Sequence, residues 1–410
     1  MSGIYIARQP VFDGSMQLYG YELLYRKSSN NYYEGTDDDH STAELLDNFF
    51  SLGFGRLIDG TRGFVNFSEK LLRIEAPLML PPENLVVEIL ERVKPDSGVI
   101  EAVKKLKHMG YRIALDDFVI EDERQYSKLL DYVDIIKLEC SESSVEAKKK
   151  FLKKYRNKIE FLAEKVETAE DYRRAQQFGF TLFQGYFFSK PAMISAKAIG
   201  ALTNNLIPIL EELSAPEPDY QCIAEIFEKD LDLSYKLLRI ANSVFSGVRY
   251  TIKSIHQALV RLGTDELTRW VNLMLLRKMK NSDNAELVKA SLIRGKMLAM
   301  FADIIGQHEQ EPDFFFTGIF SSIDALLGEN MKDILQRLPL AEPVREALLG
   351  EVNFLRGPLD AVLAYENARW DEVDAFLSEV QLGRDVFISL YMDALDWQQS
   401  TLSGYLDEAQ

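Results

Sequence analysis

Residues 85–118 read LVVEILERVKPDSGVIEAVKKLKHMGYRIALDDF. The two ends of this stretch, Leu85–Leu90 and Arg112–Phe118, are short and mostly apolar, as is typical of strands that are covered on both faces. Between them, Gly98–Met109 has apolar residues three or four positions apart, which indicates an amphipathic helix. The stretch therefore predicts a strand–helix–strand unit, in which the two strands run parallel in one sheet.

The same alternation runs through the first half of the chain. The β-rich runs are Ile4–Phe12, Leu18–Tyr25, Gly63–Phe67, Leu85–Leu90, Arg112–Phe118, Val133–Leu138, Glu160–Val166 and Thr181–Phe188. Helical spacing also appears in Ala43–Phe54, Val145–Arg156 and Ala169–Phe178. Eight strands with helices between them predict a small α/β barrel of the TIM type. Val11-Phe12-Asp13-Gly14 indicates a hairpin, so we expect the first strand to run antiparallel.

The second half of the chain shows helical periodicity only. The expected helices are Ala198–Ser214, Tyr220–Glu228, Leu233–Ala241, Ser254–Leu262, Asp265–Met279, Ala285–Ile305, Asp313–Leu327, Met331–Gln336, Glu342–Leu349, Pro358–Tyr365, Trp370–Val380 and Arg384–Tyr405. Gly263 is expected to stop the helix that begins near Ser254. We therefore expect two domains, an α/β barrel over 1–197 and an all-α domain over 198–410.

Charge and cysteine content exclude several classes of protein. The 410 residues contain 47 Lys and Arg against 64 Asp and Glu, a formal net charge of −17, which argues against a nucleic-acid-binding protein. Residues 201–410 carry most of this excess, with 19 basic and 33 acidic groups. The chain has two cysteines, Cys140 and Cys222, and no apolar run of membrane-spanning length. We expect a cytoplasmic protein with no membrane span.

Polar side chains interrupt or close the apolar runs of the first half. They are Glu22, Asn66, Glu88, Asp116, Asp117, Lys137, Glu164 and Gln184. Because chemistry in a β/α barrel lies where strands end, we expect these groups to meet at one rim. Converging carboxylates repel one another unless a cation compensates them, and oxygen ligands suit Mg²⁺ or Mn²⁺. Carboxylate-bound metals commonly serve phosphodiester hydrolysis. The alternative is that each group is an ordinary structural residue of the rim.

The motifs around these residues resemble the EAL family, whose members bind and hydrolyse cyclic di-GMP. The signature stands here as Glu22-Leu23-Leu24, and Leu115-Asp116-Asp117-Phe118 matches the Asp-Asp-Phe motif of the family. The resemblance covers residues 4–192 and implies metal binding by Glu22, Asn66, Glu88, Asp116, Asp117 and Glu164. It implies catalytic roles for Lys137 and Glu164. It also implies ligand contacts by Gln9, Arg26, Gln184 and Pro191, and a loop-supporting role for Glu91.

One departure from the family lies directly after Phe118. The family continues with a Gly-Thr-Gly-Tyr-Ser-Ser loop, whereas this chain has Val119-Ile120-Glu121-Asp122-Glu123-Arg124-Gln125. Glycine permits backbone torsions that Val and Ile disfavour, and three acids oppose an anionic ligand. Lys165 stands where the family has glycine in an Ala-Glu-Gly motif. The sequence therefore predicts an altered loop beside the expected site.

Residues 200–300 resemble the HDOD domain, a helical relative of the HD metallohydrolases. Where those enzymes have a His-Asp metal dyad, this chain has Ser321-Ser322 in Gly318–Asp324, and serines cannot replace such ligands. His256 lies in an apolar helical stretch and is expected to be a core or boundary residue. The resemblance implies a non-catalytic domain that interacts with an unidentified protein partner.

Three hypotheses follow from the sequence. The first is a cyclic di-GMP receptor or adaptor whose helical domain transmits the bound state. The second is an active phosphodiesterase that uses Mg²⁺ or Mn²⁺ to give linear pGpG, with Ca²⁺ supporting binding without turnover. The third is a nucleotide-independent interaction scaffold. The sequence leaves turnover and a homodimer open.

Overall fold

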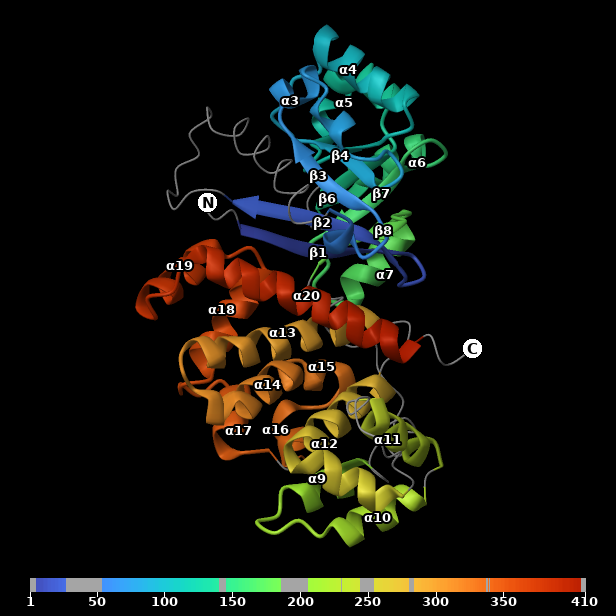
Figure 1. Cartoon of the computed structure of the whole chain (residues 1–410). Coiled ribbons are helices and arrows are strands. Elements are labelled where there is room, and N and C mark those ends of the chain that lie inside the picture. The colour runs from blue at the N-terminus through green and yellow to red at the C-terminus, as the bar shows by residue number, and fades with distance from the viewer. Residues whose placement is uncertain are drawn as a thin grey trace. The chain divides into compact units, whose positions relative to one another are not determined.

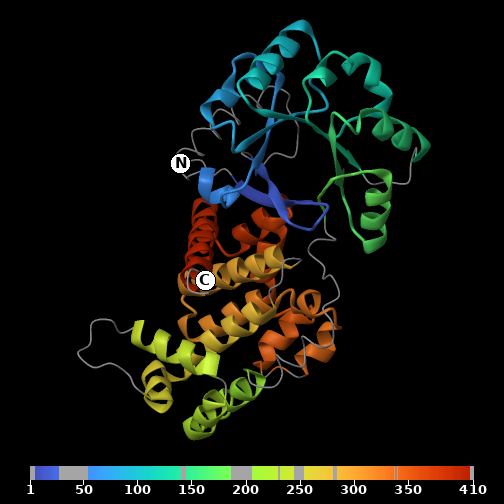
Figure 2. The ribbon, with the colours of Figure 1, turned by 90° about the vertical axis from the view of Figure 1, so that its right-hand side faces the viewer.

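The structure is a computed structural model that describes residues 5–26, 54–139, 145–185, 206–229, 231–243, 254–279, 284–336, 338 and 340–406. Grouped by their contacts, residues 1–189 and 360–410 form one compact unit, the barrel unit, and residues 190–359 form a second, the helical unit. Figures 1 and 2 show the ribbon of both units. In the part of the chain described here, no helix is long and apolar enough to span a bilayer.

Eight strands close the barrel in chain order. They are β1 (Tyr5–Asp13), β2 (Leu18–Arg26), β3 (Gly63–Phe67), β4 (Leu85–Ile89), β5 (Arg112–Leu115), β6 (Ile135–Glu139), β7 (Glu160–Glu164) and β8 (Leu182–Phe183). β1 pairs antiparallel with both β2 and β8, and all other neighbours are parallel. The predicted barrel with an antiparallel first strand is therefore confirmed.

Short helices connect the parallel strands. The barrel unit has α2 (Phe54–Ile58), α3 (Glu69–Arg73), α4 (Ser97–His108), α5 (Glu123–Tyr126), α6 (Val145–Tyr155) and α7 (Ala169–Phe178). Local sequence sets the ends of several of them. Asp96 caps the start of α4 by accepting from two backbone N–H groups, and Thr168 and Asp171 form a capping box at the start of α7. Gly179 ends α7 in the left-handed conformation.

One layer of apolar side chains fills the barrel interior. It consists of Val11, Phe64, Val86, Ala114, Ile135, Leu162 and Leu182, all of them buried. Each comes from a different strand, and the eighth strand, β2, contributes Gly20 opposite Val11. A Cβ on Gly20 would lie 2.5 Å from the backbone oxygen of Arg62, so the close approach of β2 and β3 requires glycine here.

The last two helices belong to the barrel unit. They are α19 (Trp370–Glu379) and α20 (Arg384–Leu406), which follow α18 (Arg356–Glu366). Trp370 stacks on Tyr5 of β1 with ring centroids 5.1 Å apart, and the Tyr365 hydroxyl donates to the Ile6 carbonyl oxygen. The expected limits, 1–197 and 198–410, assign these helices to the all-α domain. Residues 360–410 instead group with β1 because their aromatic and polar side chains pack against it.

The helical unit contains the remaining helices. They are α9 (Leu206–Leu213), α10 (Tyr220–Glu228), α11 (Leu231–Ser243), α12 (Ile255–Met279), α13 (Ala285–Ile304), α14 (Glu311–Phe320), α15 (Ile323–Leu327), α16 (Met331–Leu335) and α17 (Glu342–Leu348). Gly263 has non-helical torsions inside α12, so the expected stop is present. The single helix expected over Asp313–Leu327 is instead α14 and α15, divided at Ser321 and Ser322. His256 is exposed, so its expected core or boundary position is wrong.

Candidate metal and nucleotide site

The candidate residues lie one layer beyond the apolar layer of the barrel. Side chains two positions apart on a strand point to the same face. Asn66 and Glu88 each follow an apolar-layer residue of the same strand by two positions, as do Lys137 and Glu164. Asp116 and Gln184 have the same spacing and stand directly after the ends of β5 and β8. Glu22 follows Gly20 in the same way, and Gln9 precedes Val11 by two because β1 runs antiparallel. The strand period therefore directs all eight polar side chains into the barrel mouth.

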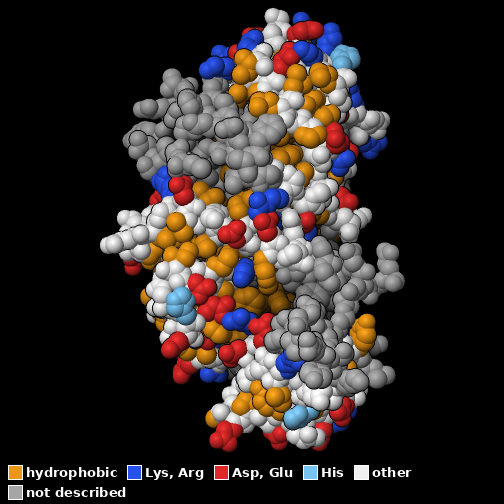
Figure 3. Space-filling view, in the orientation of Figure 1, with side chains coloured by type: hydrophobic (Ala, Val, Ile, Leu, Met, Phe, Trp, Pro, Cys, Tyr) orange, Lys and Arg blue, Asp and Glu red, His pale blue; other side chains and the backbone are white. Residues whose placement is uncertain are grey.

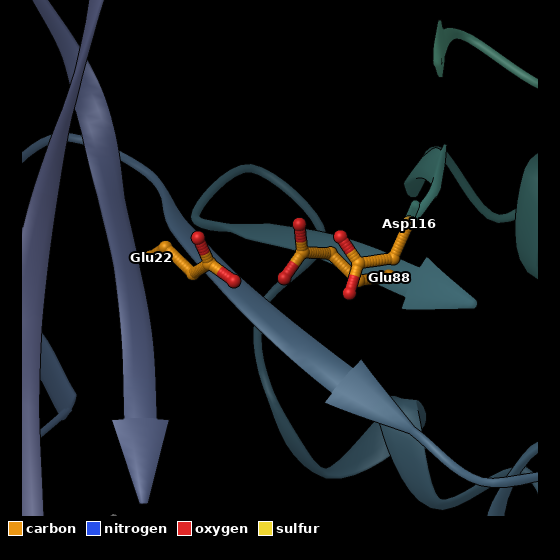
Figure 4. Close-up of side chains that lie close together, drawn as sticks. All are labelled: Glu22, Glu88 and Asp116. Atoms are coloured by element: carbon orange, nitrogen blue, oxygen red, sulfur yellow. The ribbon is translucent and has the colours of Figure 1, made fainter. Parts of the chain in front are cut away.

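Three carboxylates converge closely at this mouth. Glu22, Glu88 and Asp116 each offer an oxygen atom, and these oxygens lie within 4.8 Å of one another. Their carboxylates point toward one another, as Figure 4 shows. Glu88 is fully buried and Glu22 is 7% exposed. Three acids at this separation form a compact oxygen-rich group of the kind that binds a divalent cation.

Lys137 lies among these carboxylates and is 1% exposed. Its Nζ atom is 2.7 Å from Asp116 Oδ1, 3.0 Å from Glu88 Oε1 and 3.1 Å from Glu22 Oε1. A fourth carboxylate, that of Glu164, lies 3.2 Å from the same nitrogen atom. One ammonium group thus faces four carboxylates, so the cluster keeps a net negative charge when all its groups are ionised.

Burial shifts the proton affinities of these acids. It raises the pKa of the Glu88 carboxyl well above its usual value, against the opposing attraction of Lys137. Burial likewise raises the pKa of Asp116, and it raises that of Glu164 to about 7. For Lys137, burial acts to lower the pKa, but the surrounding carboxylates outweigh it and hold the pKa well above its usual value. The cluster therefore favours additional positive charge.

Several buried oxygens of the site accept no hydrogen bond from the described residues. They are Asn66 Oδ1, Glu88 Oε2, Glu164 Oε2 and Gln184 Oε1, whereas Glu88 Oε1 lies 3.0 Å from Lys137 Nζ. Buried polar atoms are normally paired, so such a group of acceptors in one place points to a cation or a ligand. The Gln184 amide donates to Glu22 Oε2 at 2.6 Å and to Gln9 Oε1 at 3.3 Å. The oxygen donors, carboxylates together with the carboxamide of Asn66, fit Mg²⁺ or Mn²⁺.

Four predicted residues are not among the clustered side chains that the structure describes. Asp117 is exposed, with its backbone in the left-handed region at a φ of 42°. The Glu91 side chain is also exposed, while its backbone oxygen accepts from the Tyr126 hydroxyl. Arg26 is the last residue of β2, and its side chain lies outside the described residues, as does Pro191.

Two backbone positions beside Glu164 and Gln184 were not among the predicted site residues. Gly185 has a φ of 146°, and a Cβ there would lie 2.4 Å from the backbone nitrogen and oxygen of Val166. Lys165 has a φ of 53°, which explains why glycine suits its position. A glycine directly after a polar strand end is a signal that could have identified the first of them.

The altered segment after Phe118 forms a 3₁₀ turn over Ile120–Asp122 followed by α5. Glu121 and Asp122 are exposed, and Glu123 accepts a hydrogen bond of 2.9 Å from the Tyr155 hydroxyl and pairs with Lys154. One of the three acids is thus neutralised by α6, which weakens its opposition to an anionic ligand.

In the helical unit, the predicted dyad position is occupied by an arginine contact. Arg294 of α13 is buried, and its Nη1 atom donates to the hydroxyls of Ser321 at 3.0 Å and Ser322 at 2.6 Å. α13 and α14 approach closely here, since a Cβ on Gly318 would lie 2.4 Å from the backbone nitrogen of Gly295. A guanidinium beside two serines is a poor place for a metal cation.

Comparison with known proteins defines the class. The EAL domain model matches residues 61–191, and the HDOD domain model matches residues 199–337. The chain is 37% identical over 402 residues to the uncharacterised protein YuxH of Bacillus subtilis, covering 96% of this chain and 98% of that protein. It is 34% identical over 400 residues to the cyclic di-GMP phosphodiesterase CdgJ of Vibrio cholerae, covering 96% of this chain and 92% of that protein.

These full-length matches show the family: the chain belongs to the proteins that carry an EAL domain followed by an HDOD domain. Among solved structures, it is similar to the EAL domain of FimX from Pseudomonas aeruginosa bound to c-di-GMP. That match has 21% identity and a TM-score of 0.37, and covers 45% of this chain and 89% of that chain.

Proposed function

We propose that the barrel unit is a metal-dependent phosphodiesterase that hydrolyses cyclic di-GMP to linear pGpG. The observation that carries the proposal is the buried cluster of Glu22, Glu88 and Asp116 around Lys137. The substrate is inferred from the EAL domain match and from the full-length relative CdgJ, which is named for this activity.

Each residue of the cluster has a proposed task. Glu22, Glu88 and Asp116, with Asn66, would hold Mg²⁺ or Mn²⁺. A bound cation supplies charge stabilisation at the phosphate and lowers the pKa of water. Glu164 Oε2 accepts no hydrogen bond within the described chain and is available to take a proton from an attacking water. The Lys137 ammonium stabilises negative charge at the floor of the site.

The two glutamines have a different task in this proposal. Gln184 fixes the Glu22 carboxylate through its amide group and keeps Oε1 free of protein hydrogen bonds among the described residues. It can therefore accept a hydrogen bond from a nucleotide, as can Gln9 at the partly exposed edge of β1. Arg26 and Pro191 would complete the ligand contacts implied by the family, and Asp117 would join the metal ligands at the rim.

For the helical unit we propose an interaction module without hydrolase activity. Ser321 and Ser322 stand where the related enzymes have their metal dyad, and both accept hydrogen bonds from Arg294, which supports this assignment. Residues 201–410 carry 33 acidic against 19 basic groups, and Figure 3 shows Asp and Glu side chains scattered among apolar, basic and other side chains. Such a surface suits a basic or amphipathic protein partner.

Calorimetry and product analysis test the barrel assignment on the full chain. We expect cyclic di-GMP to bind with Ca²⁺ and to be converted to pGpG with Mn²⁺. Glu22→Ala and Asp116→Ala should each abolish turnover. Glu160→Ala, at the opposite end of β7 from Glu164, is the matched control and should leave turnover unchanged.

The outcomes separate the three hypotheses. Binding without any product in Mg²⁺ and Mn²⁺ would make the protein a receptor, and absence of binding would make it a scaffold. Turnover that survives in both Glu22→Ala and Asp116→Ala would refute the metal assignment.

A further inference from the structure

Tyr126 connects two loops at the mouth of the barrel. It is the last residue of α5, and its hydroxyl lies 3.1 Å from the backbone oxygen of Glu91 and 3.0 Å from that of Val93. Glu91 and Val93 belong to the loop that follows β4, the strand of Glu88. The α5 segment follows Asp116. One buried hydroxyl therefore ties together the two loops that continue from two of the clustered carboxylates.

The ring of Tyr126 extends this connection toward the site. It contacts Phe118 edge-to-face, with centroids 5.5 Å apart, and Phe118 stacks on Phe151 of α6 at 5.5 Å. The backbone N–H of Phe118 donates to the carbonyl oxygen of Lys137 at 3.2 Å, and that of Asp116 donates to the Ile89 oxygen at 3.0 Å. Tyr126, Phe118 and Phe151 form an aromatic brace, and all three side chains are buried.

The brace reaches Glu91 through the backbone of that residue. The Glu91 side chain is exposed, and the loop-supporting role that the family resemblance implies for it stays a prediction. The backbone oxygen of Glu91 accepts a hydrogen bond from the Tyr126 hydroxyl. Because a backbone oxygen is present in any residue, the side chain at position 91 is not needed for this contact.

We propose that Tyr126 is a positioning residue for the metal cluster, and this rests on the proposed function. Its hydroxyl holds the loops after β4 and β5 together, so that the Glu88 and Asp116 carboxylates keep the separation that a divalent cation requires. The segment that replaces the family's glycine loop is thus held to the loop after β4 by its own residue Tyr126. Loss of a group that hydrogen-bonds a metal ligand directly lowers metal affinity about 10- to 100-fold, so a contact one step further from the ligands is expected to act at the lower end, about 10-fold.

Tyr111 supplies a matched control from the same barrel. Its hydroxyl donates to the Leu80 carbonyl oxygen at 2.7 Å, and it too is buried. Tyr111 precedes β5 and Leu80 precedes β4, so this tie lies at the opposite end of the same two strands. Each of the variants Tyr111→Phe and Tyr126→Phe therefore removes a hydrogen bond from a tyrosine hydroxyl to a backbone oxygen. The bond lost in Tyr111→Phe lies far from the cluster, and the bond lost in Tyr126→Phe lies beside it.

The experiment measures Mn²⁺ binding to the full chain without nucleotide, by calorimetry, for wild type, Tyr126→Phe, Tyr111→Phe and Glu91→Gln. Hydrogen exchange of residues 90–94 and 116–126 is measured on the same samples. We expect Tyr126→Phe to weaken Mn²⁺ binding about 10-fold and to speed exchange in both loops. Tyr111→Phe should lower the melting temperature without changing Mn²⁺ affinity, and Glu91→Gln should match wild type.

Three results would overturn the proposal. The first is unchanged Mn²⁺ affinity in Tyr126→Phe, and the second is an equal loss in Tyr111→Phe, which would reduce the effect to general stability. The third is a loss in Glu91→Gln as large as that in Tyr126→Phe. A wild-type chain that binds no Mn²⁺ would refute the metal site itself and the positioning role with it, whereas the first three results leave the proposed function standing.

Discussion

Replacing Lys137 by Met should strongly lower the stability of the barrel unit, because the buried carboxylates then lack a compensating positive charge. Met keeps most of the length of the side chain but removes the ammonium group that faces four carboxylates at 2.7–3.2 Å. Removing one partner of a buried ion pair costs about 3–5 kcal/mol, because the remaining charge is left uncompensated. For a unit of this size, that corresponds to a melting temperature roughly 6–20 °C lower.

Thermal melting of Lys137→Met in EDTA and in Mn²⁺ measures this effect. A divalent cation can replace the lost positive charge, so Mn²⁺ should raise the melting temperature of the variant more than that of wild type. Lys158→Met is the control, since Lys158 pairs with Asp131 at the surface and should change stability by less than about 0.5 kcal/mol. A variant as stable as wild type in EDTA, or one that gains no more from Mn²⁺, would refute the electrostatic reasoning.

Three further substitutions test other parts of the structure. Gly185→Ala should cost at least about 2 kcal/mol in urea unfolding, because a Cβ would meet the Val166 backbone at 2.4 Å and the positive φ adds strain; an unchanged midpoint would contradict this. Asp374→Asn should weaken the packing of the C-terminal helices on β1, since Asp374 accepts a hydrogen bond from the Tyr5 hydroxyl at 2.6 Å. Limited proteolysis should then cleave α19 faster than in wild type, and equal rates would count against this role of the contact. Arg294→Met should leave hydrolysis of cyclic di-GMP by the full chain unchanged, and a large loss would argue for a catalytic helical unit.

The sequence predicted the strands well because their pattern is local. Short apolar runs such as Leu85–Leu90 and Glu160–Val166 coincide with β4 and β7 to within two residues at each end. The convergence of the polar groups also followed from local spacing. All of them except Asp117 lie two residues from the layer position of their strand, and the strand period then determines the direction of their side chains.

Other features depend on contacts between residues far apart in the chain, so they could not be predicted from short stretches of sequence. The grouping of α19 and α20 with the barrel rests on pairs such as Tyr5–Trp370, which are separated by most of the chain. The exposed position of His256 is set by how α12 packs, which the apolar residues beside it did not reveal. The brace at Tyr126 is likewise invisible in sequence, because its acceptors are backbone oxygens that every residue possesses.

The proposed function requires that Glu22, Glu88 and Asp116 bind a divalent cation. A crystal structure of the full chain grown with Mn²⁺, with anomalous data collected near the manganese edge, tests this directly. We expect an anomalous peak within about 2.0–2.3 Å of an oxygen from each of these three carboxylates. A cluster without a peak, with Lys137 still paired to all of them in saturating Mn²⁺, would contradict it.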